Sequence, residues 1–299
     1  MNISKWLSEN TESLKGKTVA VTGTTGGLGK ELCKYLAALG TSLILIDRNA
    51  TKSENFRSEL LSLYPNISVK LINADLQSIC SVKTATEELK KLSPDIFIHN
   101  AGAYSIPREI TETGFDNVFQ INFISPYSII KELLPIISRK GGKVVAVGSI
   151  AHNYSKADKK DVDFRSRKRA TKVYGNAKRY LTISLEELFK SEDTVKLSIT
   201  HPGISFTNIT AHYPKLIFAL IKHPMKIIFM KPKKACLSIL MGVFAETKNG
   251  DWIGPRVFNV WGYPRKKPLK TATPEEKRFI YETAEEIYNE IKNGDYLSL

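Results

Sequence analysis

The sequence predicts an α/β fold built on a doubly wound, mostly parallel β-sheet, because two patterns alternate along its first half. Short, nearly continuous apolar runs rich in β-branched residues recur at 17–23, 41–47, 68–75, 95–102 and 142–149. Parallel strands covered on both faces have this composition. The stretches between them, such as 28–39 and 81–92, are long enough for crossover helices, and such βαβ alternation is typical of a parallel sheet.

At 299 residues the chain could be one large α/β domain or two small ones, and the lack of a clear boundary favours a single domain over 1–299. The chain is 42% hydrophobic and 25% charged, which is ordinary for a soluble globular protein. No repeat or low-complexity linker divides it. Two later apolar runs, 195–203 and 256–262, could extend the sheet.

Cysteine usage and the N-terminal segment favour a cytoplasmic protein. The three cysteines lie far apart, without a CxxC pair or metal-ligand spacing, so we expect a reducing compartment and no metal site. The N-terminal segment lacks the apolar stretch of a secretory signal.

The net charge of +14 is concentrated in two segments. Residues 152–180 carry ten basic and three acidic side chains, and residues 201–270 carry twelve and two. Such clusters can attract an anionic ligand or an anionic lipid surface, and a plain solvated face explains them equally well. No helix-turn-helix, zinc-finger or RNA-binding motif accompanies the charge, so we expect no nucleic-acid partner.

Three segments depart from the βαβ rhythm. Residues 155–172 read as an exposed loop. Residues 204–232 mix aromatic, aliphatic and basic side chains with prolines, and their apolar stretches are too short to span a bilayer. The sequence Thr-Pro-Glu-Glu at 273–276 is a capping box with proline at the first helical position, which predicts a helix over about 274–292.

A glycine-rich turn, TGTTGGLG at 22–29, joins the first strand run to the first helical pattern. Gly23 permits a tight turn, Gly27 lets the backbone approach a ligand, and Gly29 lets the helix pack against the strand. A pyrophosphate is stabilised at such a helix N-terminus by free N–H groups and the helix dipole. The residues of this turn expected to contact a dinucleotide are Gly23, Thr25, Gly27, Leu28 and Gly29.

Asp47 and Arg48 make opposite predictions about the dinucleotide. Asp47 ends the second strand run, 18 residues after Gly29, where a carboxylate accepts hydrogen bonds from the adenosine ribose of NAD. Arg48 could instead pair with the 2′-phosphate of NADP. Neither Thr24 nor Thr25 is basic, so the sequence leans towards NAD.

The motifs together resemble the short-chain dehydrogenase/reductase family over about residues 15–265. YGNAKRYL and HPGISFTN resemble most closely its retinol-dehydrogenase-like and protochlorophyllide-reductase-like branch. Two positions depart from the family pattern, since His99 precedes Asn100-Ala101-Gly102 and Gly148 precedes Ser149. The motifs that carry the resemblance are TGTTGGLG, Ala74-Asp75-Leu76, Asn100-Ala101-Gly102, Asn122, Ser149, Tyr174-Gly175-Asn176-Ala177-Lys178 and Pro202-Gly203 with Thr207.

Tyr174 and Lys178 are four residues apart, so on a helix their side chains share one face. A tyrosine hydroxyl has a pKa near 10, too high for a base at neutral pH, and a nearby ammonium lowers that pKa. Tyr174 is therefore the predicted general acid/base. The resemblance implies that Lys178 also binds the nicotinamide ribose, that Ser149 holds the substrate oxygen, and that Asn122 positions a water leading from Lys178 to solvent.

The resemblance further implies a cofactor cleft formed by several chain segments. Asp75 is expected near the adenine ring, and Pro202-Gly203 is expected to bend the chain beside the nicotinamide. The expected cofactor contacts beyond the glycine-rich turn are Asp47, Arg48, Asp75, Leu76, Asn100, Ala101, Gly102, Tyr174, Lys178, Pro202, Gly203 and Thr207.

The expected function is an oxidoreductase that transfers hydride between NAD(P) and an alcohol or carbonyl substrate. Residues 204–232 would cover the substrate, and their composition suits a lipophilic compound, with an anionic tail or a membrane surface for their lysines. A core helix with snorkelling lysines gives the same pattern. Family members often form homo-oligomers through helices that flank the sheet. The alternative function is a non-catalytic NAD(P)-binding sensor on the same fold.

Overall fold

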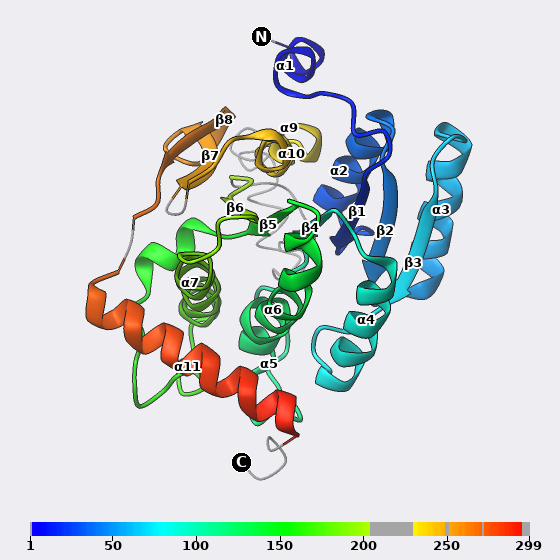
Figure 1. Ribbon diagram of the computed structural model, residues 1–299. Helices are drawn as coiled ribbons and strands as arrows, with labels where there is room; N and C mark the ends of the chain where they lie inside the picture. Colours follow the sequence, from blue (N-terminus) through cyan, green and yellow to red (C-terminus); the bar gives the residue numbers. More distant parts are fainter. Residues whose placement is uncertain (1, 204–229, 249–250, 271, 295–299) are drawn as a thin grey trace, which may run out of the picture.

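A computed structural model describes residues 2–203, 230–248, 251–270 and 272–294. It contains one eight-stranded sheet in the order β3-β2-β1-β4-β5-β6-β7-β8 (Figure 1). Every neighbouring pair is parallel except β7 and β8, so the predicted doubly wound parallel sheet is confirmed. The strands are β1 (Thr18–Thr22), β2 (Ser42–Asp47), β3 (Val69–Asn73), β4 (Ile96–His99), β5 (Lys143–Val147), β6 (Lys196–Thr200), β7 (Asp251–Val257) and β8 (Trp261–Pro268).

Helices cover both faces of the sheet, with α2, α3 and α10 on one side and α4, α6, α7 and α11 on the other (Figure 1). None of the described helices is long and apolar enough to cross a membrane. The helices are α1 (Ile3–Asn10), α2 (Gly27–Ala38), α3 (Ala50–Leu63), α4 (Ile79–Leu92), α5 (Asn117–Phe119), the π-helical turn η1 (Gln120–Ile124), α6 (Ser125–Ser138), the 3₁₀ turn η2 (Ile150–Tyr154), α7 (Ala170–Leu188), α9 (Pro232–Ala235), α10 (Leu237–Phe244) and α11 (Pro274–Asn293).

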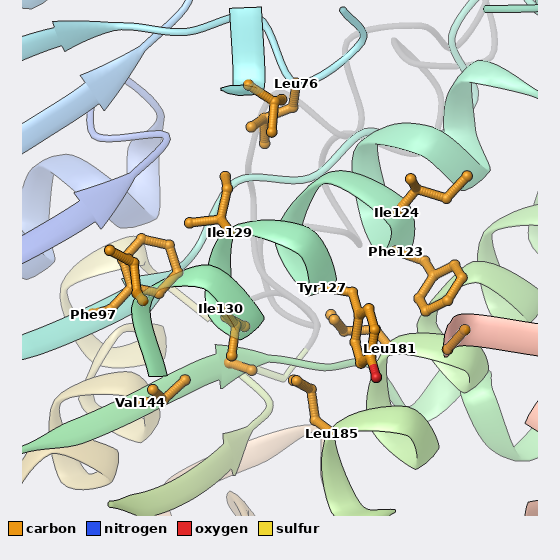
Figure 2. Close-up of a cluster of buried hydrophobic side chains, with 14 of the residues drawn as sticks. Leu76, Phe97, Phe123, Ile124, Tyr127, Ile129, Ile130, Val144, Leu181 and Leu185 are labelled. Atoms are coloured by element: carbon orange, nitrogen blue, oxygen red, sulfur yellow. The ribbon is translucent and has the colours of Figure 1, made fainter. Parts of the chain in front are cut away.

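The alternation of side chains along each strand divides the core into two clusters. In β1, Val19 and Val21 pack under α2 and α10, whereas Ala20 packs under α4 and α6. Successive strand residues point to opposite faces, so nearly continuous apolar runs can feed both clusters. Figure 2 shows part of the cluster on the side of α4, α6 and α7, where Tyr127 of α6 lies against Leu181 of α7.

The expected extension of the sheet by the run 256–262 takes the form of a hairpin. The run 256–262 is not a single strand, because it holds the end of β7, a turn and the start of β8. Phe258 and Asn259 take left-handed backbone conformations, with φ of 50° and 59°, and reverse the chain between the two strands. The strong β propensity of the run belongs to a hairpin, and apolar composition alone does not locate its turn.

Residues 155–172 form a loop up to the start of α7 at Ala170, but this loop is not uniformly exposed. Asp163 and Phe164 are buried. The Asp163 carboxylate accepts from the Asp116 N–H and pairs with Arg165, which fixes the loop against the chain ahead of α5.

The C-terminal helix α11 is clamped to α7 by an ion pair. Thr273 caps α11 by accepting from the Glu276 N–H, as the capping box predicts. The Glu276 carboxylate accepts two bonds of 2.7 Å from the guanidinium of Arg179 in α7. Arg179 also donates to the His152 carbonyl in η2, so three elements meet at one side chain.

Glu276→Gln is expected to lower the free energy of unfolding by about 2 kcal/mol at pH 7, because Arg179 loses a charge-assisted partner. Burial raises the Glu276 pKa, but the hydrogen bonds from Arg179 and the Ala157 N–H, together with the charges of Arg179 and Lys156, outweigh burial and the net pKa is lowered. The ion pair therefore contributes above the unfolded Glu pKa of about 4.3 and is lost as the pH falls through the lower folded pKa. Urea titrations at several pH values measure this difference.

The matched control is Glu286→Gln, an exposed position on the same helix. Equal losses for the two variants, or a Glu276→Gln effect that does not shrink in acid, would contradict the role of the clamp.

Candidate active site

A cavity of 390 Å³ opens at the carboxyl ends of β1 and β4. These two strands are neighbours, and the chain leaves β1 towards β2 but β4 towards β5. Ligands of doubly wound folds bind at such a switch point. Predicted cofactor residues that line the cavity are Gly23, Thr25, Gly27, Leu28, Gly29, Asp47, Arg48, Asp75, Leu76, Asn100, Ala101 and Gly102.

The remaining predicted cofactor residues lie elsewhere. Tyr174, Lys178, Pro202 and Gly203 do not line this cavity. Thr207 and residues 204–229 of the expected substrate cover lie outside the described residues. Contact with a cofactor therefore stays a prediction for all of these positions.

The glycine-rich turn leaves no room for side chains at two of its glycines. A Cβ on Gly29 would lie 2.2 Å from the Gly23 carbonyl oxygen, and one on Gly23 would lie 2.9 Å from the Ala101 Cα. Gly23 also has a φ of 72°. The first turn of α2 has neither a side-chain cap nor an acidic residue, so its backbone N–H groups face the cavity mouth as donors for an anion. The turn fits a dinucleotide pyrophosphate.

Asp47 is buried and turned towards the glycine-rich turn. Its Oδ2 accepts from the hydroxyls of Thr24 and Ser53. Its Oδ1 accepts from the N–H of Thr25 at 3.0 Å and from the Thr25 hydroxyl at 3.1 Å. A carboxylate offers about four acceptor positions, so these four bonds use the hydrogen-bonding capacity of Asp47.

Arg48 differs from Asp47 in its exposure to solvent and in the partners of its side chain. Its side chain is exposed and lines the cavity, while its backbone carbonyl is held at 3.0 Å by the Asn73 side chain. Within the described part of the chain, its guanidinium forms no ion pair. A planar guanidinium in this position can bind a phosphate through two parallel bonds.

Tyr174 of α7 lies beside Ser149, the second residue after β5 and the N-cap of η2. Burial raises the pKa of Tyr174 to about 12, although a hydrogen bond from the Ser149 hydroxyl lowers it in part. The ring of Tyr104 contacts Tyr174 edge-to-face, with centroids 5.3 Å apart. The phenol is therefore protonated at neutral pH and held beside a second hydroxyl.

Lys178 lies one turn further along α7 and is 2% exposed. Its Nζ donates to the Val147 carbonyl at 2.9 Å and lies 5.9 Å from the Tyr174 ring centroid. Burial lowers the pKa of Lys178 to about 7. Lys178 also contributes to the lowered pKa of His99, whose main cause is burial, so His99 stays neutral.

Asn122 lies in the π-helical turn η1 and ties that turn to the loop after β4. Its Nδ2 donates at 2.8 Å to the carbonyls of Val118 and Ala103, and its Oδ1 accepts from the Ala103 N–H at 3.3 Å. A Cβ on Gly102 would lie 2.9 Å from this Oδ1 and 3.6 Å from the Lys178 Nζ. The space between Asn122 and Lys178 therefore exists because residue 102 is glycine.

Asn100 braces the switch point. Its Nδ2 donates to the carbonyls of Thr22 and Gly23, at 3.0 and 3.1 Å. In return, the Thr22 hydroxyl accepts from the N–H groups of Asn100 and Ala101. These bonds lock the ends of β1 and β4 together below the glycine-rich turn.

Asp75 and the Pro202-Gly203 turn have structural partners of their own. The Asp75 carboxylate accepts from the Gln77 N–H at 3.0 Å and closes a short turn before α4. Gly203 has a φ of 78°, and a Cβ there would lie 2.6 Å from the Val260 carbonyl oxygen. The chain after β6 is thus pressed against the turn between β7 and β8.

Sequence reasoning missed Tyr104 and the hydroxyl groups around Asp47. Tyr104 lines the cavity and contacts Tyr174, and its only signal is a position two residues after Gly102. Thr24 lies within the glycine-rich motif and Ser53 within none, but nothing in the sequence indicates their role, because it depends on a carboxylate that folding brings to them.

These groups lie together beside the cavity. The Tyr174 phenol is protonated at neutral pH, the Ser149 hydroxyl lies beside it, and Lys178 is buried one helical turn further along α7. The described residues contain no group of three or more His, Cys, Asp or Glu side chains placed to hold a metal ion.

Comparisons with known proteins identify the family of this chain. A family model described as short chain dehydrogenase matches residues 17–213. A short chain dehydrogenase of Aspergillus sclerotiorum, resG, is 35% identical over 158 residues, which cover 48% of this chain and 44% of that protein. Human retinol dehydrogenase 13 is 28% identical over 206 residues, covering 67% of this chain and 62% of that protein. Human polyprenol dehydrogenase is 26% identical over 207 residues, covering 66% and 63%.

Solved structures support the fold. An uncharacterised protein of Mycobacterium paratuberculosis superposes with a TM-score of 0.74 at 21% identity, covering 94% of this chain and 97% of that one. The RhlG protein of Pseudomonas aeruginosa, solved with NADP, has a TM-score of 0.58 at 24% identity, covering 79% and 91%.

Gly29→Ala is expected to lower the free energy of unfolding by about 1–3 kcal/mol, because the new methyl group overlaps the Gly23 carbonyl. It should also weaken nicotinamide dinucleotide binding in a fluorescence titration. Gly26→Ala is the control, since its Cβ would meet no atom closer than 3.5 Å. A Gly26 variant that loses as much as the Gly29 variant would disprove the close approach.

Proposed function

Since the chain belongs to the short-chain dehydrogenase family, we propose that it transfers hydride between NADP and a lipophilic alcohol or carbonyl compound, with Tyr174 as general acid/base. The observation that carries this proposal is the Tyr174 phenol, which lies beside Ser149 and one helical turn from the buried Lys178. The bound dinucleotide would supply or accept the hydride.

The residues of this chain handle the proton. In reduction, Tyr174 gives its proton to the carbonyl oxygen of the substrate while Ser149 donates a hydrogen bond to the same oxygen. In oxidation, the phenolate removes the proton from the alcohol. A pKa of about 12 makes Tyr174 an acid rather than a base in the site as it stands. A second positive charge near the phenolate, added to Lys178, would lower that pKa.

Lys178 supplies charge in a way that depends on pH. Its pKa of about 7 means that the ammonium loses its proton as the pH rises through neutrality. A nearby anion, such as a dinucleotide phosphate, would raise that pKa and keep the ammonium charged. The side chain is held by the Val147 carbonyl, so it changes charge without changing place.

A lipophilic substrate is supported by the walls near Tyr174. Tyr104, Ile106 and Ile121 line the cavity on this side. Two relatives, named for retinol and polyprenol, can be aligned with about two thirds of this chain. An apolar wall with a few polar groups is the usual form of a small-molecule site.

NADP is supported by the contrast between Asp47 and Arg48. The sequence leans towards NAD because Asp47 could accept from the ribose, but four protein donors already use the carboxylate. Arg48 is exposed at the same cavity wall and can take the 2′-phosphate. Asp47 therefore shapes the glycine-rich turn, and Arg48 selects the cofactor.

Tyr174→Phe is expected to lower kcat by at least about a hundredfold, the usual contribution of a positioned acid/base, while dinucleotide binding changes little. NADPH oxidation over a panel of lipophilic aldehydes and ketones measures kcat, and fluorescence titration measures binding. Retained turnover would disprove the role of Tyr174. Dinucleotide binding by the unmodified chain without turnover on any substrate would instead favour a sensor.

Arg48→Ala is expected to weaken NADPH binding about tenfold or more, the loss of charge-assisted bonds to a phosphate, with little effect on NADH. Arg57→Ala, in α3 and paired with Glu54, is the control and should leave the NADPH to NADH ratio unchanged. An unmodified chain that prefers NADH, or an Arg48 variant that loses both cofactors equally, would overturn the choice of NADP.

A further inference from the structure

The hairpin of β7 and β8 ends in a group of exposed apolar side chains. Phe258 is 85% exposed, Val257 is 42% exposed and Trp261 is 39% exposed. They follow one another around a single turn, so their exposed surface is contiguous along the chain. Isolated exposed apolar residues are ordinary, but a cluster with a polar rim marks an interaction site.

The backbone conformation of this turn costs conformational free energy. Phe258 and Asn259 have φ of 50° and 59°, and the Val260 N–H closes the turn on the Val257 carbonyl at 2.9 Å. Hairpin turns with two left-handed residues normally use glycine, asparagine or aspartate. A bulky aromatic residue in this conformation is an outlier, and such strain is found where a side chain has a task beyond folding.

Basic side chains surround the apolar tip. Arg256 and Arg265 are exposed on the two strands of the hairpin. The helix α9 lies beside β8, since the Lys234 Nζ lies 4.7 Å from the Tyr263 ring centroid, and it adds the exposed Lys233. Among residues 230–248 and 251–270, the acidic residues are Glu246 and Asp251, and Asp251 is paired with Lys266. The rim is therefore strongly cationic.

The tip lies on the side of the sheet that carries the active site. β7 is parallel to β6, so its carboxyl end meets the same edge as those of β1, β4 and β5. The turn also abuts Gly203, where a Cβ would lie 2.6 Å from the Val260 carbonyl oxygen and 2.9 Å from Pro255. A surface that engages the tip therefore faces the carboxyl edge of the sheet.

We propose that the tip of the β7–β8 hairpin docks the protein on the surface of an anionic lipid bilayer. Phe258, Val257 and Trp261 enter the interface, and the surrounding arginine and lysine side chains bind lipid phosphates. This is the arrangement of peripheral membrane proteins, in which apolar burial and attraction to anionic lipid add together. A lipophilic substrate would then reach the site from the bilayer.

A second copy of the chain fits this surface less well. β8 is the edge strand, and edge pairing between copies would bring two cationic faces together. Pro264 and Pro268 also interrupt the donors along β8, which is a common protection against edge-to-edge pairing. The positive charge of the rim attracts anionic lipid and would repel the same rim of a second copy.

The test is co-sedimentation of the full chain with vesicles of phosphatidylcholine, with and without phosphatidylserine. We expect binding only when phosphatidylserine is present, and loss of binding at high salt. Phe258→Asn should lower the partition coefficient about tenfold, the equivalent of one buried aromatic side chain. Because asparagine tolerates a left-handed conformation, the thermal midpoint of this variant should stay the same or rise. Arg265→Glu should lower binding by more than about fivefold, because the loss of one positive charge alone corresponds to about fivefold and the variant also adds a negative charge.

Two variants at the opposite edge of the sheet serve as matched controls. Leu63→Asn removes an apolar side chain that is 56% exposed at the end of α3, and Lys70→Glu reverses an exposed charge on β3. Both should bind as the unmodified chain does. The assay contains no cofactor or substrate, so its outcome is separate from that of the proposed reaction.

Three results would overturn the proposal. The unmodified chain could remain in the supernatant with phosphatidylserine vesicles, or Phe258→Asn could sediment as the unmodified chain does. Light scattering could instead show a dimer that Phe258→Asn disperses, which would make a second copy the occupant of the tip.

Discussion

A cation buried inside an α/β fold needs a fixed oxygen partner, and Lys178 finds one in the Val147 carbonyl. That bond joins α7 to the end of β5 and places Tyr174 beside Ser149, the second residue after Val147. The buried ammonium also restricts which residues can lie next to it. Residue 102 has to be glycine, and Asn122 has to be turned towards the loop after β4, for the space around the Nζ to exist. Burial of this charge costs free energy, and in the proposed reaction the charge would lower the pKa of the Tyr174 phenol.

Much of the fold could be predicted from the sequence, because parallel strands buried on both faces have an unmistakable composition. Six strand runs and the glycine-rich turn lie where their patterns indicate. The hairpin at 256–262 could not be found in this way, since apolar residues continue through its turn and no glycine marks the reversal. Tyr104 was missed because its contact with Tyr174 joins residues seventy positions apart.

The residues near Asp47 show a different limit of sequence reasoning. A pattern can assign a carboxylate to a position, but it cannot count the donors that reach that carboxylate after folding. Thr24, Thr25 and Ser53 supply four bonds to the Asp47 carboxylate, and no sequence pattern indicates that these donors converge there. The neighbouring Arg48 is exposed for the same reason, because β2 ends with Asp47 turned inwards.

The position of α11 has a consequence for synthesis on the ribosome. Ile280, Ile287 and Ile291 of this helix complete the cluster formed by α4, α6 and α7, and Glu276 neutralises Arg179 beside the active site. Because the ribosome makes α11 after all these elements, the nascent chain holds an uncovered apolar face and an unpaired arginine until α11 has emerged. Apolar surface exposed during that interval favours aggregation.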